Sequence, residues 1–260
     1  MRIIASGISN KGLIREKNED NLLFFDRILD EYHEGTEKLI YFSDNTDIKP
    51  LICGVFDGLG GYSRGERASF IMSRMALNCA ITCRDNPNEI PHILEDLCLQ
   101  TNREICQEIE NNCEKMGTTA SILCFYRDYV VICNVGDTPI FRFRFGGLEP
   151  IFEEHSQKVF FEKLFGKEFL GNRKFPLTQC IGVPESVMQI RPYINTEEII
   201  PGDRYLICSD GLTDMITEDR INEIMETELA QDQLLSILVK ESLENGGKDN
   251  ITAILIEVLP

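Results

Sequence analysis

The sequence has little positive charge, few histidines and no long apolar run. Its 260 residues include 26 Lys and Arg against 43 Asp and Glu, so the formal net charge is −17. This shortage of basic residues argues against binding to nucleic acid or anionic membranes, because affinity for polyphosphate depends on Lys and Arg. The longest apolar runs, such as 51–56, are far shorter than the roughly 18 residues needed to cross a bilayer. No N-terminal segment resembles a signal peptide, so we expect a cytoplasmic protein without a membrane partner.

Cysteine and histidine give little support for a disulfide scaffold or a zinc site. The three histidines are far apart and no C-x-x-C pair occurs. Ten cysteines are present, but a chain of this length does not need disulfides to stabilise a core. Several lie inside apolar runs, where a free thiol behaves as a small apolar side chain; these are Cys53, Cys124, Cys133 and Cys208. We therefore expect reduced, buried thiols.

Apolar periodicity predicts helices in pairs, with groups of strands between them. The predicted strands lie near 2–8, 21–25, 38–42, 51–56, 119–126, 129–135, 139–145, 187–194, 204–208 and 251–258. The predicted helices lie near 64–84, 89–113, 218–228 and 231–245. Because strands and helices do not alternate strictly, the pattern favours an α+β layered domain with largely antiparallel sheets.

Two segments are less regular than the rest. Residues 146–178 are rich in Gly, Phe, Lys and Glu, and we call them the flap segment because their pattern is typical of a mobile flap. Residues 26–50 resemble a polar hairpin or a loop insertion. Neither is a linker long enough to divide the chain, so we expect residues 1–260 to form a single domain.

Acidic residues stand at the ends of four predicted strands. Asp57, Asp137 and Asp210 follow apolar strands, and Asp249 stands just before the last one. Any one of these is more often a simple turn, since Asp and Gly are good turn formers. Four carboxylates gathered at strand ends would repel one another unless a cation lay between them. An all-oxygen set of this kind suits hard cations, Mg²⁺ or Mn²⁺.

A charged segment near the N-terminus adds a candidate phosphate contact. Arg15 lies just ahead of Glu19 and Asp20, before the apolar residues 22–25. The planar guanidinium matches the geometry of phosphate oxygens, so beside a metal cluster Arg15 would hold a phosphoryl group. Standing alone, this segment is more often a solvated charged turn. The glycine-rich stretch 57–66 lacks the spacing of a nucleotide-binding loop, and its glycines more plausibly let backbone approach a metal.

Taken in order, these segments resemble the metal-dependent protein phosphatases (PPM, type 2C), particularly the bacterial Ser/Thr phosphatases. The matching stretches are REKNEDN (15–21), GVFDGLGG (54–61), GTTAS (117–121), NVGDTPIF (134–141), EHS (154–156), LTQCIG (177–182), GDRYLICSDGLTDMI (202–216) and GGKDNITAILI (246–256). They run through nearly the whole chain in family order. The resemblance implies a four-layer α-β-β-α sandwich, two antiparallel β-sheets flanked by helix pairs, with a two-metal centre at one end.

The resemblance also implies roles for individual residues. It implies that Asp57 bridges two Mn²⁺ or Mg²⁺ ions, that the Gly58 carbonyl binds one of them, and that Asp210 and Asp249 hold the other. Glu19 and Asp20 would act through metal-bound water or as direct neighbours, and Arg15 would grip the substrate phosphate. Asp137 would help to bind a third, weaker ion. The implied reaction is hydrolysis of phosphoserine or phosphothreonine in proteins by a metal-activated water, without a protein nucleophile.

The chain departs from the family pattern at several positions near the predicted site. Eukaryotic members have His where this chain has Leu59, so the proton for the leaving group must come from water or another residue. Many bacterial members have His where this chain has Tyr62, Ser-Arg where it has Thr138-Pro139 and Arg where it has Gln179. Loss of the positive charge at positions 139 and 179 would alter substrate docking or product release. We interpret His155 as a structural, hydrogen-bonding histidine.

Three functional hypotheses follow. The first is a Mg²⁺- or Mn²⁺-dependent protein phosphatase, a monomer that opposes a Ser/Thr kinase. The second is a non-catalytic phosphoprotein-binding module that kept the fold, which the presence of all three central carboxylates disfavours. The third is a phosphatase acting on a small metabolite or as a dedicated anti-sigma antagonist, which pocket contacts would decide.

Overall fold

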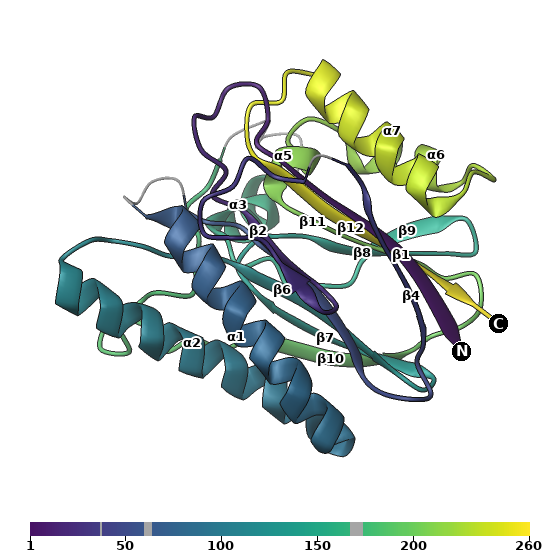
Figure 1. The fold of residues 1–260 in the computed structure, drawn as a ribbon. Helices are drawn as coiled ribbons and strands as arrows, with labels where there is room; N and C mark the ends of the chain where they lie inside the picture. Colours follow the sequence, from purple (N-terminus) through teal and green to yellow (C-terminus); the bar gives the residue numbers. More distant parts are fainter. Residues whose placement is uncertain (37, 60–63, 167–173) are drawn as a thin grey trace.

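The computed structural model describes residues 1–36, 38–59, 64–166 and 174–260. Two six-stranded antiparallel sheets lie face to face, and helices cover the outer face of each (Figure 1). The α-β-β-α sandwich expected from the sequence is confirmed. Within the described residues, no helix is both long enough and apolar enough to span a bilayer.

The first sheet carries both ends of the chain. Its strands, in spatial order, are β4 (Ile40–Asn45), β1 (Arg2–Asn10), β12 (Ile251–Leu259), β11 (Arg204–Cys208), β8 (Ile140–Arg144) and β9 (Gly147–Pro150). Helices α6 (Glu218–Met225) and α7 (Gln231–Glu244), with the short α5 (Asp210–Thr213), cover its outer face. The leucines of α7 recur at helical spacing and are buried against this sheet, which explains why the segment forms a helix here.

The second sheet is covered by the two longest helices. Its spatial order is β10 (Tyr193–Glu198), β7 (Tyr129–Val135), β6 (Ala120–Tyr126), β5 (Leu51–Phe56), β2 (Asn21–Phe24) and β3 (Arg27–Ile28). Helix α1 (Gly65–Asp85) and helix α2 (Ile90–Asn112), joined by the 3-10 turn η1 (Pro87–Glu89), pack on its outer face. The central strands β5 and β6 are buried along their whole length because both of their faces are covered.

Three apolar layers hold the sandwich together. One lies between the sheets, one between α1, α2 and the second sheet, and one between α6, α7 and the first sheet. The cysteines are free, and Cys53, Cys124, Cys133 and Cys208 are buried among these apolar side chains, as the sequence predicts.

Two sequence-based boundaries need correction. The predicted strand at 187–194 is wrong, because residues 185–187 form a turn and the strand is β10, 193–198. Its second half, Asn195–Glu198, is polar because β10 is an edge strand, so apolar periodicity does not mark it. The insertion predicted at 26–50 is more than a loop, since β3 and β4 within it extend one edge of each sheet.

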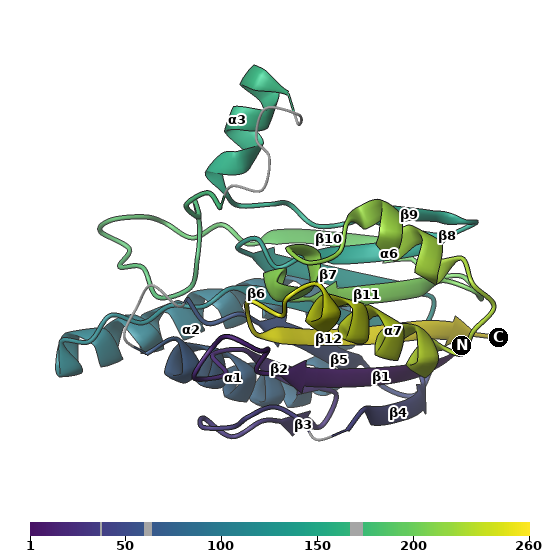
Figure 2. The ribbon, with the colours of Figure 1, turned by 90° about the horizontal axis from the view of Figure 1, so that it is seen from above.

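The flap segment combines sheet and helix. Its first residues form β9, and α3 (Gln157–Phe165) projects away from the two sheets, as seen from above in Figure 2. No side chain of α3 is buried, in contrast to α1. Residues 167–173 of the predicted flap lie outside the described residues, and the single-domain boundary 1–260 stays a prediction.

Candidate metal centre and phosphate site

The strand pairing brings the predicted acidic residues to one edge of the sandwich. In the second sheet, the end of β5 pairs with the start of β2, and the end of β7 pairs with the start of β6. In the first sheet, the end of β11 pairs with β12 near its start. Residues directly after β5, β7 and β11, and directly before β2 and β12, therefore meet at this edge.

A cleft of about 330 Å³ opens there. Seven of the eight predicted site residues line it: Arg15, Glu19, Asp57, Gly58, Asp137, Asp210 and Asp249. The eighth, Asp20, is only 2 % exposed and lies beneath the cleft. Three further residues line the cleft: Leu59, Lys174 and Leu177. The sequence thus identified the cleft's polar lining except for one lysine.

One wall of the cleft is a loop held by a single buried asparagine. We call residues 11–20 the anchored loop. The Asn250 side chain donates hydrogen bonds to the carbonyl oxygens of Lys11 (2.8 Å) and Lys17 (2.9 Å), and it accepts one from the Glu19 amide (2.8 Å). The Leu13 amide donates to the Gly247 carbonyl oxygen at 2.7 Å. These bonds fix the position from which Arg15 reaches into the cleft.

Close backbone approach at two glycines brings the cleft's segments together. A Cβ on Gly58 would lie 2.3 Å from the Glu19 carbonyl oxygen, and one on Gly211 would lie 2.0 Å from the Asn250 carbonyl oxygen. Both distances are far below van der Waals contact, so only glycine fits. The Asp-Gly pairs at 57–58 and 210–211 thus serve packing in addition to placing a carboxylate.

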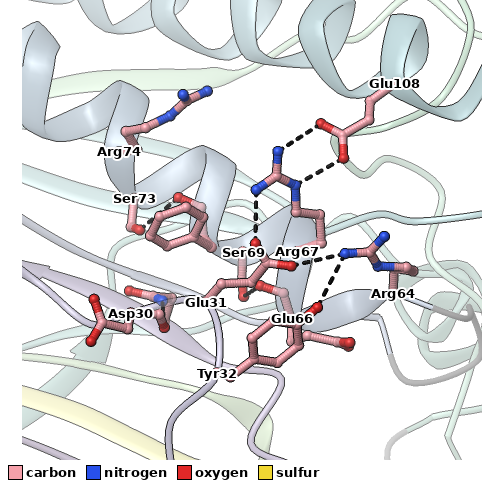
Figure 3. A network of polar contacts seen from close by, with 12 residues as sticks. Asp30, Glu31, Tyr32, Arg64, Glu66, Arg67, Ser69, Ser73, Arg74 and Glu108 are labelled. Atoms are coloured by element: carbon pink, nitrogen blue, oxygen red, sulfur yellow. Dashed lines mark hydrogen bonds and ion pairs between the residues drawn. The ribbon is translucent and has the colours of Figure 1, made fainter. Parts of the chain in front are cut away.

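An ion-pair network lies at the start of α1 (Figure 3). Arg67 contacts Glu31 and Glu108, each at 2.8 Å, and Arg64 contacts the same Glu31 at 2.8 Å. Glu31 lies in the loop after β3, while Glu108 lies on α2. The network therefore ties that loop, α1 and α2 together.

Burial and mutual repulsion perturb the carboxylates at this edge. Burial raises the pKa of Asp20 to about 7, although its Oδ2 accepts a hydrogen bond from the Ser209 hydroxyl at 2.7 Å. Burial, followed by the charges of Asp20 and Asp210, raises the pKa of Asp57 well above its ordinary value. Burial and then Asp210 raise the pKa of Asp137 to about 7. The ionised carboxylates at this edge therefore destabilise one another unless a cation binds among them.

Asp249 behaves differently from the other carboxylates. Burial tends to raise its pKa, but hydrogen bonds from Arg15 and the Asn250 amide outweigh burial and lower it. Arg15 Nη2 lies 2.7 Å from Asp249 Oδ2.

Lys174 supplies a cation that the sequence analysis missed. Its Nζ lies 2.9 Å from Asp210 Oδ2, 3.1 Å from Asp214 Oδ2 and 3.3 Å from Asp249 Oδ2. Asp214 was missed too, although its position four residues after Asp210 in SDGLTD could have indicated a shared helical face. No comparable signal marked Lys174, which is far from the acidic motifs in sequence.

The donor set fits hard divalent cations. The lining offers carboxylates and the Gly58 carbonyl, all oxygen ligands of the kind that Mg²⁺ and Mn²⁺ accept. As they stand, no three carboxylate, imidazole or thiol groups of the described residues converge on one point in a way that could hold an ion. Asp210 and Asp249 instead converge on the Lys174 ammonium, which shows that this point attracts a cation.

The remaining predicted positions differ in their relation to the cleft. Leu59 lines it, whereas Thr138 is buried and shares a hydrogen bond with Thr119 (2.6 Å). Gln179 accepts a hydrogen bond from the Arg191 amide at 2.7 Å. His155 is buried and its Nδ1 accepts a hydrogen bond from the Gly136 amide at 3.2 Å, the structural role predicted for it. Tyr62 lies outside the described residues.

Comparison with known proteins identifies the family. Residues 41–245 match the family model described as protein phosphatase 2C. The chain belongs to the protein phosphatase 2C family. It is 28 % identical over 257 residues to the serine/threonine phosphatase stp of Listeria monocytogenes serotype 4b (strain F2365), covering 96 % of this chain and 93 % of that protein. The family expected from the sequence, and with it the enzyme class, a protein phosphatase, is therefore confirmed.

Solved structures confirm the protein phosphatase 2C fold. The serine/threonine phosphatase of S. agalactiae matches with a TM-score of 0.80 at 22 % identity, covering 98 % of this chain and 99 % of that one. The catalytic domain of the phosphatase PstP, solved with two manganese ions, matches with a TM-score of 0.76 at 22 % identity, covering 100 % of both chains.

Proposed function

We propose that this chain hydrolyses phosphoserine and phosphothreonine in proteins at a divalent-metal centre in the cleft. The observation that carries the proposal is that Asp57, Asp210 and Asp249 line one cleft together with Arg15, in a member of the protein phosphatase 2C family. These three carboxylates with one arginine make a site for cations that in turn bind a phosphoryl group.

The chain's oxygen donors would hold two ions, Mn²⁺ or Mg²⁺. Asp57 and the Gly58 carbonyl would bind on one side, and Asp210 with Asp249 on the other, with Asp137 available to a third ion. When bound, the ions would activate a water near neutral pH and neutralise charge on the phosphoryl oxygens. Glu19 lies at the cleft wall, where it would accept hydrogen bonds from water bound in the cleft.

Arg15 and Asp20 have supporting roles of different kinds. Arg15 would bind and orient the phosphoryl group, since its guanidinium presents several donors at fixed angles. Asp20 acts from beneath, because its charge adds to that of Asp57 and strengthens the attraction for cations. Leu59 has no proton to give, so the leaving oxygen takes its proton from water or another group at the site.

The substrates would be proteins phosphorylated by a Ser/Thr kinase, and we expect the chain to act on them as a monomer in the cytoplasm. The Listeria relative is named a serine/threonine phosphatase, which supports this choice of substrate.

The test is hydrolysis of a phosphothreonine peptide with Mn²⁺, with Mg²⁺ and with EDTA, for the wild type and Asp210→Asn. We expect phosphate release that needs metal and falls by about 100-fold or more in Asp210→Asn, because the variant loses charge that stabilises the transition state. A folded wild type that binds Mn²⁺ but releases no phosphate would contradict the proposal and favour the non-catalytic phosphoprotein-binding module.

A further inference from the structure

Lys174 is placed in the cleft by a part of the chain that carries none of the acidic motifs. It lies after α3, in the flap segment, and Phe175 beside it packs on Phe161 of α3 at 5.5 Å between ring centroids. Its side chain is 61 % exposed, yet its ammonium reaches three carboxylates at the cleft.

The Lys174 ammonium and the Arg15 guanidinium both contact the same carboxylate oxygen, Asp249 Oδ2. Arg15 Nη2 lies 2.7 Å and Lys174 Nζ 3.3 Å from Asp249 Oδ2. Two cations from opposite walls repel each other unless an anion lies between them. Here the anion is a carboxylate that the proposed function assigns to a metal ion.

Asp214 gives Lys174 a further ion-pair partner outside the set of residues predicted to bind metal. Its carboxylate is 39 % exposed and lies 3.1 Å from Lys174 Nζ, one helical turn after Asp210. When Asp210 and Asp249 bind divalent ions, the ammonium is repelled from them but remains attached to Asp214 at the rim. An ion pair as exposed as Lys174–Asp214 contributes little to stability by itself.

We propose that Lys174 is a second phosphate-binding cation, opposite Arg15, which Asp214 holds at the rim of the cleft. The inference rests on the proposed function and deepens it. The doubly charged phosphoryl group of a phosphoserine or phosphothreonine would replace Asp249 as the anion that both cations contact, once that carboxylate binds a metal ion. Lys174 contacts the phosphoryl group and is not a donor of protons to the reaction.

The proposal has a consequence that needs no turnover. Because the ammonium competes with divalent ions for Asp210 and Asp249, removing it tightens Mn²⁺ binding. Removing it also weakens phosphate binding to the metal-loaded protein. These two opposite effects on affinity separate a phosphate-binding lysine from one that merely neutralises the acidic edge.

The experiment compares the wild type with Lys174→Met, Lys174→Arg and Lys158→Met. Lys158→Met is the matched control, since Lys158 is an exposed lysine of α3 that pairs with Glu154 and does not line the cleft. Calorimetry gives the Kd of Mn²⁺ and then the Kd of inorganic phosphate for the Mn²⁺-saturated protein. Kinetics with a phosphothreonine peptide give kcat and KM.

For Lys174→Met we expect phosphate Kd and peptide KM to rise about 10-fold, the effect of one charge-assisted hydrogen bond, and Mn²⁺ Kd to fall. Lys174→Arg restores phosphate binding, and Lys158→Met matches the wild type. An unchanged phosphate Kd in Lys174→Met overturns the proposal, even if Mn²⁺ binds more tightly. Failure of the proposed function would show differently, as a wild type that binds Mn²⁺ and phosphate without turnover.

Discussion

The cleft has two walls, and they are held in place by different means. The anchored loop is fixed by hydrogen bonds from the buried Asn250, which do not involve the cleft's own carboxylates. On the other wall, Lys174 is held by ion pairs to the carboxylates themselves, and the helix before it, α3, buries no side chain. The backbone that carries Arg15 therefore keeps its place whatever occupies the cleft, although the guanidinium itself pairs with Asp249. The position of Lys174 depends on the occupant.

The cleft thus combines one contact on a fixed backbone, at Arg15, with one on an adjustable segment, at Lys174. A backbone held by buried hydrogen bonds loses little entropy when a substrate binds, so the backbone that carries Arg15 is pre-organised. The flap wall has few buried apolar contacts, which is the property of segments that open locally at low cost. Under the two proposals above, a substrate would therefore meet a phosphate contact on a fixed backbone on one side and an adaptable contact on the other.

Asn250→Ala would break the fixed wall and should have the largest effect. Asn250 is 4 % exposed, and its loss leaves the carbonyls of Lys11 and Lys17 and the amide of Glu19 without their partner. We expect the free energy of unfolding to fall by about 2–4 kcal/mol, because unsatisfied buried polar groups are costly. We also expect peptide KM to rise about 10-fold, since Arg15 is no longer held in place. Urea denaturation and steady-state kinetics measure the two effects.

Asn245→Ala is the control for this prediction. Asn245 also makes a side-chain hydrogen bond, to the Met215 carbonyl at 3.0 Å, but at an exposed position at the end of α7. We expect a loss below about 1 kcal/mol and unchanged KM. An Asn250→Ala protein as stable and active as this control would show that the loop is held by other contacts.

Much of the cleft could be predicted because its residues sit beside strongly apolar strands. The strands before Asp57 and Asp210 are continuous apolar runs, so the sequence marks both where the strand ends and where the carboxylate follows. The sandwich itself follows from helix pairs separated by groups of strands.

The flap segment was predicted, but its helix and its lysine could not be, and the reason is physical. Apolar periodicity reports burial, and α3 buries nothing, so its aromatic residues did not identify a helix. Lys174 reaches the carboxylates only through the tertiary fold, and the polar half of β10 forms a strand because it pairs with β7 at the sheet edge. In both cases long-range contacts decide the structure.

The two walls should also respond differently to pH in the metal-free protein. Asp137, on the flap side, has a pKa raised to about 7 by burial and Asp210, so the folded protein binds its proton more tightly than the unfolded chain. Its contribution therefore destabilises the fold as pH rises from about 4 to 7 and stays constant above. Asp249, beside Arg15, has a lowered pKa, so its contribution is present at neutral pH and is lost only in acid.

We expect Asp137→Asn to be more stable than the wild type in EDTA at pH 7.5, by about 1–2 kcal/mol, and the gain to shrink at pH 5. Burial lowers the pKa of His33 and His155, so their contribution to the free energy of unfolding rises with pH, opposite to that of Asp137. Both histidines are present in the wild type and in the variant, so the difference between the two proteins removes their effect. Asp85→Asn, at the exposed end of α1, should show no such difference in urea denaturation. A gain independent of pH would mean that repulsion at Asp137 is not the cause.

The smallest effect is expected on α3 itself. Phe160 is 62 % exposed on α3, whereas Ile71 of α1 is fully buried in the core against the second sheet. Phe160→Ser should change the free energy of unfolding by less than about 0.5 kcal/mol, while Ile71→Ala should lower it by about 2–4 kcal/mol through the cavity it creates. Amide exchange should show the same ranking, with α3 exchanging through local opening and α1 only through global unfolding. Phe160→Ser could instead lower the free energy of unfolding as much as Ile71→Ala does. That result would mean that α3 packs against the rest of the protein in solution, and that the flap segment is as fixed as the anchored loop.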